Sequence, residues 1–107
     1  MAFVRACALT DVGEGKAFAT EVEGVEVAVV NAGGEYFAIR DECSHASIPL
    51  SEGDVDGCEI ECWLHGSRFD LRTGEPSGLP AIDPVPVYAC QVDGDDVLVD
   101  VSAATNA

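Results

Sequence analysis

Short β-branched runs alternate with charged residues along most of the chain, and no stretch places apolar residues at helical spacing. A period of two is typical of a strand with one buried and one solvated face, and β-branched residues favour such surfaces. The pattern predicts strands over residues 3–9, 16–22, 25–31, 36–40, 58–62, 85–92 and 97–101. We therefore expect an all-β fold, a small antiparallel β-sandwich or barrel.

Turn residues divide this pattern into a scaffold and an insertion. Gly33-Gly34 and the acidic stretch 93–96 each interrupt two apolar runs and predict tight hairpins. Between about 41 and 84, glycine and proline are so frequent that this segment is expected to be a loop-rich insertion. A chain of 107 residues is the size of one domain, so we expect a single domain over 1–101 and a flexible tail over 102–107.

The charge balance narrows the possible partners. Five Lys and Arg residues oppose twenty Asp and Glu residues, which gives a formal net charge of -15. Nucleic acid and anionic membranes are therefore excluded as natural partners. No apolar run approaches the roughly 20 residues of a membrane span, and the first residues lack a secretory leader, so we expect a cytoplasmic protein without a membrane anchor. The acidity fits either solubility in a salt-rich cytosol or docking to a basic partner, and the sequence leaves both open.

The two histidines of the chain each lie close to a cysteine. The first pair is Cys43-Ser44-His45, and the second is Cys62-Trp63-Leu64-His65. Thiolate and neutral imidazole both bind iron, so two loops that each supply one of them could hold a four-ligand site. A structural zinc site uses the same side chains, although zinc fingers usually group cysteine with cysteine. We expect the other cysteines, Cys7, Cys58 and Cys90, to be buried thiols.

These two segments resemble the cluster-binding loops of Rieske 2Fe-2S proteins. The resemblance extends through Leu50-Ser51-Glu52-Gly53 and through 69–74 to the closing strands. It implies one Rieske 2Fe-2S cluster on a cluster-binding subdomain, with Cys43 and Cys62 on the inner iron and His45 and His65 on the outer iron. Within the family, the chain is most similar to the ferredoxin components of bacterial aromatic-ring dioxygenase systems, which contain a non-heme iron oxygenase.

The resemblance also suggests roles for residues around the metal ligands. Ser67 matches a hydrogen-bond donor to the cluster, whereas Phe69 replaces the tyrosine of high-potential relatives and cannot donate. We therefore expect a potential in the lower part of the Rieske range of about -150 to +300 mV. Trp63, where many relatives have proline, is interpreted as a cover of the cluster, a docking contact or a packing residue. Pro80 lies in a stretch that resembles the family's third loop, which shields the cluster, or is part of an ordinary surface loop.

By resemblance the chain is a soluble one-electron carrier and not itself an enzyme. A mononuclear oxygenase iron would need two further histidines, and both histidines are already assigned. The expected partners are a flavin-dependent ferredoxin reductase as donor and a terminal oxygenase as acceptor, and a monomer suits such a shuttle. Three alternatives remain open: a ferredoxin of iron-sulfur cluster assembly, the small subunit of a nitrite reductase, and a zinc-stabilised binding module without redox function.

Overall fold

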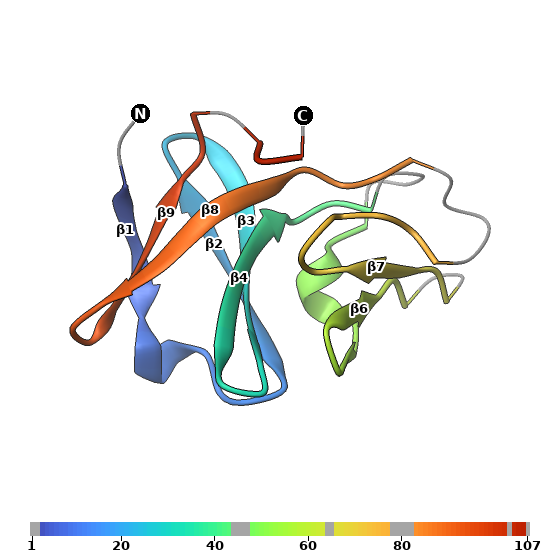
Figure 1. The fold of residues 1–107 in the computed structure, drawn as a ribbon, viewed down its shortest axis with the longest axis horizontal. Helices are drawn as coiled ribbons and strands as arrows, with labels where there is room; N and C mark the ends of the chain where they lie inside the picture. The colour runs from blue at the N-terminus through green and yellow to red at the C-terminus, as the bar shows by residue number, and fades with distance from the viewer. Residues whose placement is uncertain (1–2, 44–47, 64–65, 78–82, 103, 107) are drawn as a thin grey trace.

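The computed structural model describes residues 3–43, 48–63, 66–77, 83–102 and 104–106. Within this part of the chain, the larger sheet is antiparallel and has the strand order β1-β9-β8-β4-β3-β2 (Figure 1). Its strands are β1 (Val4–Ala8), β2 (Lys16–Val22), β3 (Val25–Ala32), β4 (Glu35–Arg40), β8 (Val87–Asp93) and β9 (Asp96–Asp100). The sheet curls until its two edge strands meet, where the Thr20 hydroxyl of β2 donates to the Ala6 carbonyl of β1 at 3.2 Å. The result is a nearly closed barrel.

The expected insertion forms a smaller antiparallel sheet beside β4 and the start of β8 (Figure 1). Its strand order is β5-β6-β7, with β5 at Val55–Asp56, β6 at Glu59–Glu61 and β7 at Arg68–Asp70. The 3-10 helix η2 (Leu50–Glu52) precedes it, and a second such turn, η1 (Leu9–Asp11), follows β1. The all-β class and the loop-rich subdomain are therefore confirmed. The sequence had predicted a single strand over 58–62 here, and β5 and β7 were not expected.

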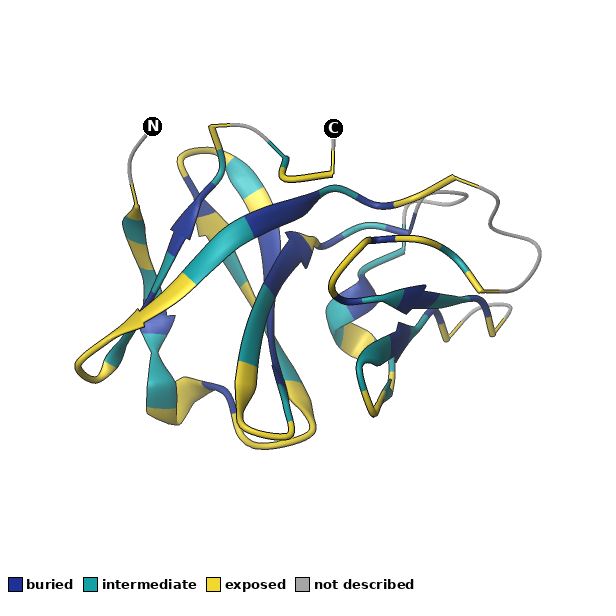
Figure 2. Cartoon of the chain, in the orientation of Figure 1, coloured by how far each residue is buried: buried dark blue, intermediate teal, exposed yellow. Residues whose placement is uncertain are grey.

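Strand β3 connects the two parts of the molecule because both of its faces are buried. Val27 and Val29 pack into one apolar cluster inside the barrel, whereas Ala28 and Val30 pack into a second cluster against the insertion. All four are fully buried, as the dark colour of β3 in Figure 2 shows. A strand covered on both faces loses the alternation of apolar and polar residues, which explains the continuous apolar run in this part of the sequence. The shared strand supports the proposal that residues 1–101 form one domain.

Two described residues of the tail, which we expect to be flexible, make hydrogen bonds to other parts of the chain. Thr105 donates its backbone N–H to the Val87 carbonyl at 2.7 Å, and the Asn106 side chain makes hydrogen bonds to Thr73, Val85 and Val87. These contacts return the chain to the start of β8, next to the insertion. Small polar residues do not predict such a contact, because hydrogen bonds between distant segments leave no periodic pattern.

Candidate metal centre

Two loops of the insertion close in the same way. The Cys43 N–H donates to the Ile48 carbonyl at 2.9 Å, and the Cys62 N–H donates to the Ser67 carbonyl at 2.6 Å. Each cysteine therefore begins a loop that its own amide closes at the fifth residue further along. Each loop contains one of the expected histidine ligands in its sequence, but His45 and His65 lie outside the described residues. The two Cys/His segments thus begin with the same closing hydrogen bond.

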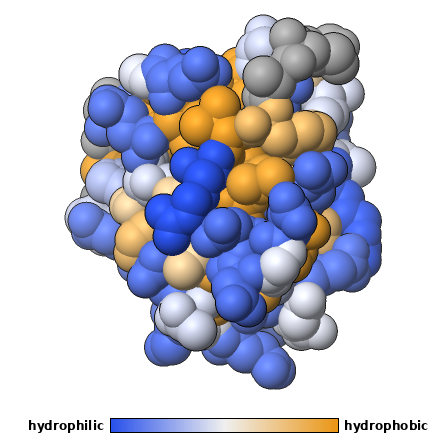
Figure 3. Space-filling view, turned by 90° about the vertical axis from the view of Figure 1, so that its left-hand side faces the viewer, coloured by the Kyte–Doolittle hydropathy of each residue, from blue (hydrophilic) through white to orange (hydrophobic). Residues whose placement is uncertain are grey.

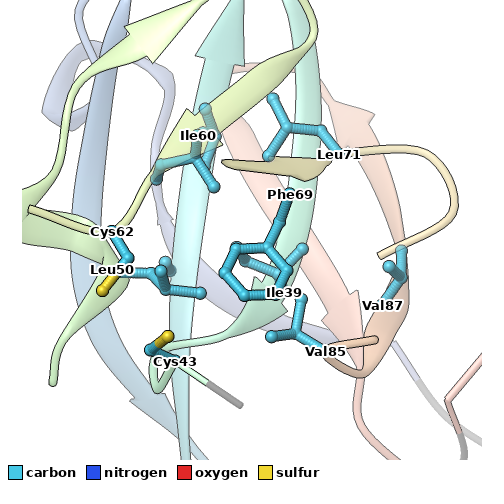
Figure 4. Packing of buried hydrophobic residues seen from close by; sticks show 11 residues of the cluster. Ile39, Cys43, Leu50, Ile60, Cys62, Phe69, Leu71, Val85 and Val87 are labelled. Atoms are coloured by element: carbon cyan, nitrogen blue, oxygen red, sulfur yellow. The ribbon is translucent and has the colours of Figure 1, made fainter. Parts of the chain in front are cut away.

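The two cysteines that begin these loops share one apolar cluster. Cys43 is 3% exposed and Cys62 is fully buried. Figure 4 shows both side chains next to Leu50, at the edge of the cluster that is remote from Leu71 and Val87. No disulfide joins any of the five cysteines, all of which the structure describes. Two buried cysteines that form no disulfide therefore lie at matching loop positions.

The donor chemistry fits an iron-sulfur centre. Thiolates and imidazoles select zinc or iron-sulfur clusters, whereas magnesium and calcium prefer oxygen ligands. Among the described residues, no group of three or more His, Cys, Asp or Glu side chains comes together to hold a metal ion. Two of the four expected ligands, Cys43 and Cys62, lie in the described part of the chain, and the whole ligand set remains a prediction.

A buried carboxylate fixes the base of the first loop. Asp41, which is 8% exposed, accepts hydrogen bonds from the Ser51 amide at 2.7 Å and the Ser51 hydroxyl at 2.8 Å. These two residues bracket the loop that begins at Cys43. The Asp41 amide donates in turn to the Glu26 carbonyl of β3 at 3.0 Å. The loop is therefore attached to the barrel independently of any metal. The sequence did not predict this contact, although Ser51 lies in a segment of the family resemblance.

The second loop joins β6 to β7, and a close backbone approach holds it against η2. Ile60 pairs with Phe69 and Glu61 with Arg68 across the two strands. A Cβ atom at Gly53, just after η2, would overlap the Glu61 carbonyl. Only glycine allows this approach. The contact sets the distance between the segments that carry the two loops.

The residues expected around the ligands have different environments. Ser67 and Phe69 are fully buried, and Figure 4 shows the Phe69 ring between Leu50 and Ile39. Trp63 is 52% exposed, so the packing interpretation of this residue is not supported. Pro80 lies outside the described residues. An exposed indole next to Cys62 is consistent with the docking interpretation.

The remaining cysteines are thiols of the β scaffold and of a hairpin turn. Cys7 is buried as expected, whereas Cys58 and Cys90 are only partly buried. Burial raises the pKa of all three thiols, and it raises the pKa of Cys90 to about 11. A protonated thiol is a poor metal ligand, because the thiolate is the form that binds metal.

Ion pairs occupy every arginine of the chain. Arg5 pairs with Asp96 at 2.8 Å, Arg40 with Glu42 at 3.3 Å, and the other two pairs are Arg68–Asp56 at 3.1 Å and Arg72–Glu35 at 3.2 Å. All are exposed pairs, which contribute little to stability. The pairs matter more for the electrostatic potential of the surface. Each arginine charge is offset by a neighbouring carboxylate, so the remaining carboxylates make the surface potential negative.

A curled antiparallel sheet beside a smaller sheet, with two loops that each contain a cysteine and a histidine, is the arrangement expected of a small iron-sulfur electron carrier. Comparison with known families identifies the class more closely. The chain matches the Rieske 2Fe-2S domain over residues 2–89. It belongs to this family and carries a Rieske 2Fe-2S cluster. It is an electron carrier and not an enzyme in its own right.

Individual relatives agree with this assignment. The chain is 41% identical over 105 residues to the biphenyl dioxygenase ferredoxin subunit of Pseudomonas sp. strain KKS102, covering 97% of this chain and 96% of that protein. The ferredoxin of carbazole 1,9a-dioxygenase from Nocardioides aromaticivorans IC177 is 42% identical, with a TM-score of 0.87 and coverage of 92% and 97%. A complex of reduced oxygenase and oxidized ferredoxin in carbazole 1,9a-dioxygenase contains a chain with 32% identity, a TM-score of 0.86 and coverage of 94% on both sides. No helix in the described part of the chain is long and apolar enough to cross a membrane.

Proposed function

We propose that this chain carries single electrons to a terminal oxygenase and that Cys43, His45, Cys62 and His65 hold its cluster. The ligand assignment rests on two loops that are closed by the same kind of backbone hydrogen bond. Each loop begins at a buried cysteine and contains a histidine in its sequence. Support for the acceptor comes from relatives that are named dioxygenase ferredoxin subunits and from the carbazole dioxygenase complex of oxygenase with ferredoxin.

When bound, the cluster supplies reversible one-electron transfer, and the chain determines its environment. The buried sulfurs of Cys43 and Cys62 would hold one iron of the cluster, and His45 and His65 would hold the other. Apolar side chains packed with the two cysteines, among them Leu50 and Phe69, would exclude water from the cysteine side of the site.

The electron donor follows from what the sequence does not contain. The chain has no dinucleotide or flavin fingerprint, so the donor is external, and we assign this role to a flavin-dependent ferredoxin reductase. We place this pathway in the cytoplasm as part of the same proposal. A monomer is the expected form.

The acceptor can be tested by anaerobic mixing. The reduced chain is mixed with the oxidised terminal oxygenase of carbazole 1,9a-dioxygenase from Nocardioides aromaticivorans IC177, and the visible spectra of both are followed in a stopped-flow instrument. We expect the chain to become oxidised as the oxygenase is reduced, at a rate that increases with oxygenase concentration. A chain that stays reduced in the presence of this oxygenase would contradict the proposed acceptor class.

Trp63 gives a sharper version of the same experiment. Replacing Trp63 with alanine should slow the transfer several-fold with little effect on the spectrum of the cluster, because an exposed indole beside the metal centre contacts the partner. The matched control is Val92→Ala, which removes another exposed apolar side chain from the far end of β8. Equal effects of the two substitutions would remove the docking role of Trp63.

A further inference from the structure

The amide of Asn106 joins two segments that are distant in sequence. Its Nδ2 atom donates hydrogen bonds to the Thr73 carbonyl and to the Val85 carbonyl, both at 2.9 Å. Its Oδ1 atom accepts a hydrogen bond from the Val87 amide at 3.1 Å. Both donor hydrogens and one acceptor position of a single side chain are therefore used on backbone groups. The two carbonyls lie at the two ends of the segment 74–84.

The two ends of this segment, at Gly74 and Val85, are closely packed against each other. The Val85 amide donates to the Gly74 carbonyl at 2.9 Å, and the Gly74 amide donates to the Asp70 carbonyl at 2.7 Å. A Cβ atom at Gly74 would overlap the Val85 carbonyl and lie 2.7 Å from Nδ2 of Asn106. Asn106 thus completes a close packing of three backbone segments.

Each end of the segment is connected to the metal centre. At the first end, Ser77 donates its amide to the Arg68 carbonyl of β7 at 2.8 Å, and β7 follows the second loop directly. At the other end, Val85 is 1% exposed and belongs to the apolar cluster that contains Cys43 and Cys62. Figure 4 shows Val85 in this cluster beside Ile39.

We propose that Asn106 is a positioning residue for the metal centre. By holding the ends of the segment 74–84 together, it keeps Val85 packed in the cluster that also contains the two ligand cysteines. Without this contact the ends separate more often, and water reaches the inner side of the centre. Water stabilises the more negatively charged reduced state, so the midpoint potential rises when the contact is lost.

The test compares Asn106→Ala with the matched control Thr105→Ala in the cluster-loaded protein. The control removes the hydrogen bond of the Thr105 hydroxyl to the Val87 carbonyl, on the same tail and the same strand, but leaves the Thr73 and Val85 contacts intact. Amide hydrogen exchange is measured on peptides that cover 70–90, and the midpoint potential is measured by redox titration.

We expect Asn106→Ala to accelerate exchange over 74–87 several-fold and to raise the midpoint potential, with the control close to wild type in both measurements. Unchanged exchange would overturn the proposed contact. Faster exchange at an unchanged potential would overturn its role toward the metal centre. Val97→Ala controls for a general loss of stability as the cause of a changed potential. It creates a cavity in the other core cluster and should leave the midpoint potential unchanged.

If Asn106→Ala loses its cluster during purification, Asn106→Asp retains an acceptor for the Val87 amide and removes both donors. Its rate of cluster loss to an iron chelator should then exceed that of wild type and of Thr105→Ala, and an equal rate would overturn the proposal. The redox and chelator measurements rest on the proposed ligand set, whereas the exchange measurement does not. A wrong ligand set therefore leaves the exchange result intact, and the two failures are distinguishable.

Discussion

At the scale of single residues, we expect Phe69 to influence the redox potential of the metal centre. It is fully buried in the cluster that contains Cys43 and Cys62, and it offers no hydrogen-bond donor. A hydrogen bond to a sulfur of the cluster or of a ligand cysteine stabilises the reduced state, so its absence keeps the potential low.

Replacing Phe69 with tyrosine should raise the midpoint potential. A net hydrogen bond of about 0.5–1.5 kcal/mol that forms only with the reduced state corresponds to roughly 20–60 mV for one electron. Redox titration of the two proteins under the same buffer conditions measures the difference. A lower or unchanged midpoint potential in a variant that retains its full iron content would show that position 69 does not face the centre.

Cys90 predicts a pH dependence of folding stability. Burial raises its pKa from 9.0 to about 11, so between these values the folded protein holds a proton that the unfolded chain has lost. The free energy of unfolding therefore receives its full contribution below about pH 9 and loses it as the pH rises to about 11. The loss is on the order of 1–2 kcal/mol, because one pKa unit is about 1.4 kcal/mol and the thiol is partly screened by water.

Cys90→Ala should show a smaller decrease over this pH range. Denaturant unfolding of both proteins at several pH values between 8 and 11 gives the slope of the free energy of unfolding against pH. The smaller alanine side chain also loses packing, but this loss is the same at every pH and does not change the slope. If the free energy of unfolding fell equally with pH in both proteins, groups other than Cys90 would cause the decrease.

The sequence identified residues whose side-chain chemistry indicates their role. It did not identify residues whose role depends on which distant segment they contact. Cysteine and histidine are rare enough that their spacing predicts a metal centre, and the two cysteines of the pattern are buried at matching loop positions. Asp41 and Asn106 were missed. Each acts on the backbone of a distant segment, and the chemistry of an aspartate or asparagine does not indicate its partner.

At the scale of elements, the larger sheet was predictable, whereas only the central strand of the smaller sheet was. The long strands carry enough alternation to be recognised, and β3 carries a continuous apolar run because both of its faces are covered. Strands β5, β6 and β7 have two or three residues each. A strand of that length has no measurable period, so tertiary packing and not local pattern forms the smaller sheet.

Gly53 tests how the two loop segments are held at their fixed separation. Gly53→Ala should destabilise the subdomain by about 2–4 kcal/mol and reduce iron content, because its Cβ would overlap the Glu61 carbonyl of β6. Thermal unfolding and iron analysis measure both effects. The matched control is Gly24→Ala, where the φ of 83° costs about 1 kcal/mol but no atom lies within 4 Å. Similar iron loss in both variants would contradict a specific role of the Gly53 contact.

At the scale of the whole molecule, charge is the dominant property of the surface. Figure 3 shows hydrophilic side chains over most of the face that looks away from the smaller sheet, with apolar side chains gathered near its centre. The net charge is -15, and the arginines are all engaged in ion pairs with carboxylates. A partner with a basic patch beside its electron acceptor is therefore attracted from a distance.

Electron transfer to such a partner should weaken steeply with ionic strength. We expect the second-order rate constant to fall by roughly tenfold between about 20 mM and 300 mM salt, because the Debye length shortens over this range. Neutralising the exposed Glu52 and Asp54 beside the smaller sheet should reduce the low-salt rate more than neutralising Asp93 and Asp95 at the distant β8–β9 hairpin. A flat salt profile, or equal effects of the two pairs, would limit the acidity to a role in solubility.

The central claim is that two loops, each offering one cysteine and one histidine, bind a single 2Fe-2S cluster. Pulsed EPR of the reduced protein tests it most directly, because it detects nitrogen nuclei bonded to the paramagnetic iron pair. The account predicts two strongly coupled imidazole nitrogens, with the coupling of one lost in each of His45→Ala and His65→Ala. A reduced cluster without coupled nitrogen, or a colourless protein that contains zinc, would contradict it.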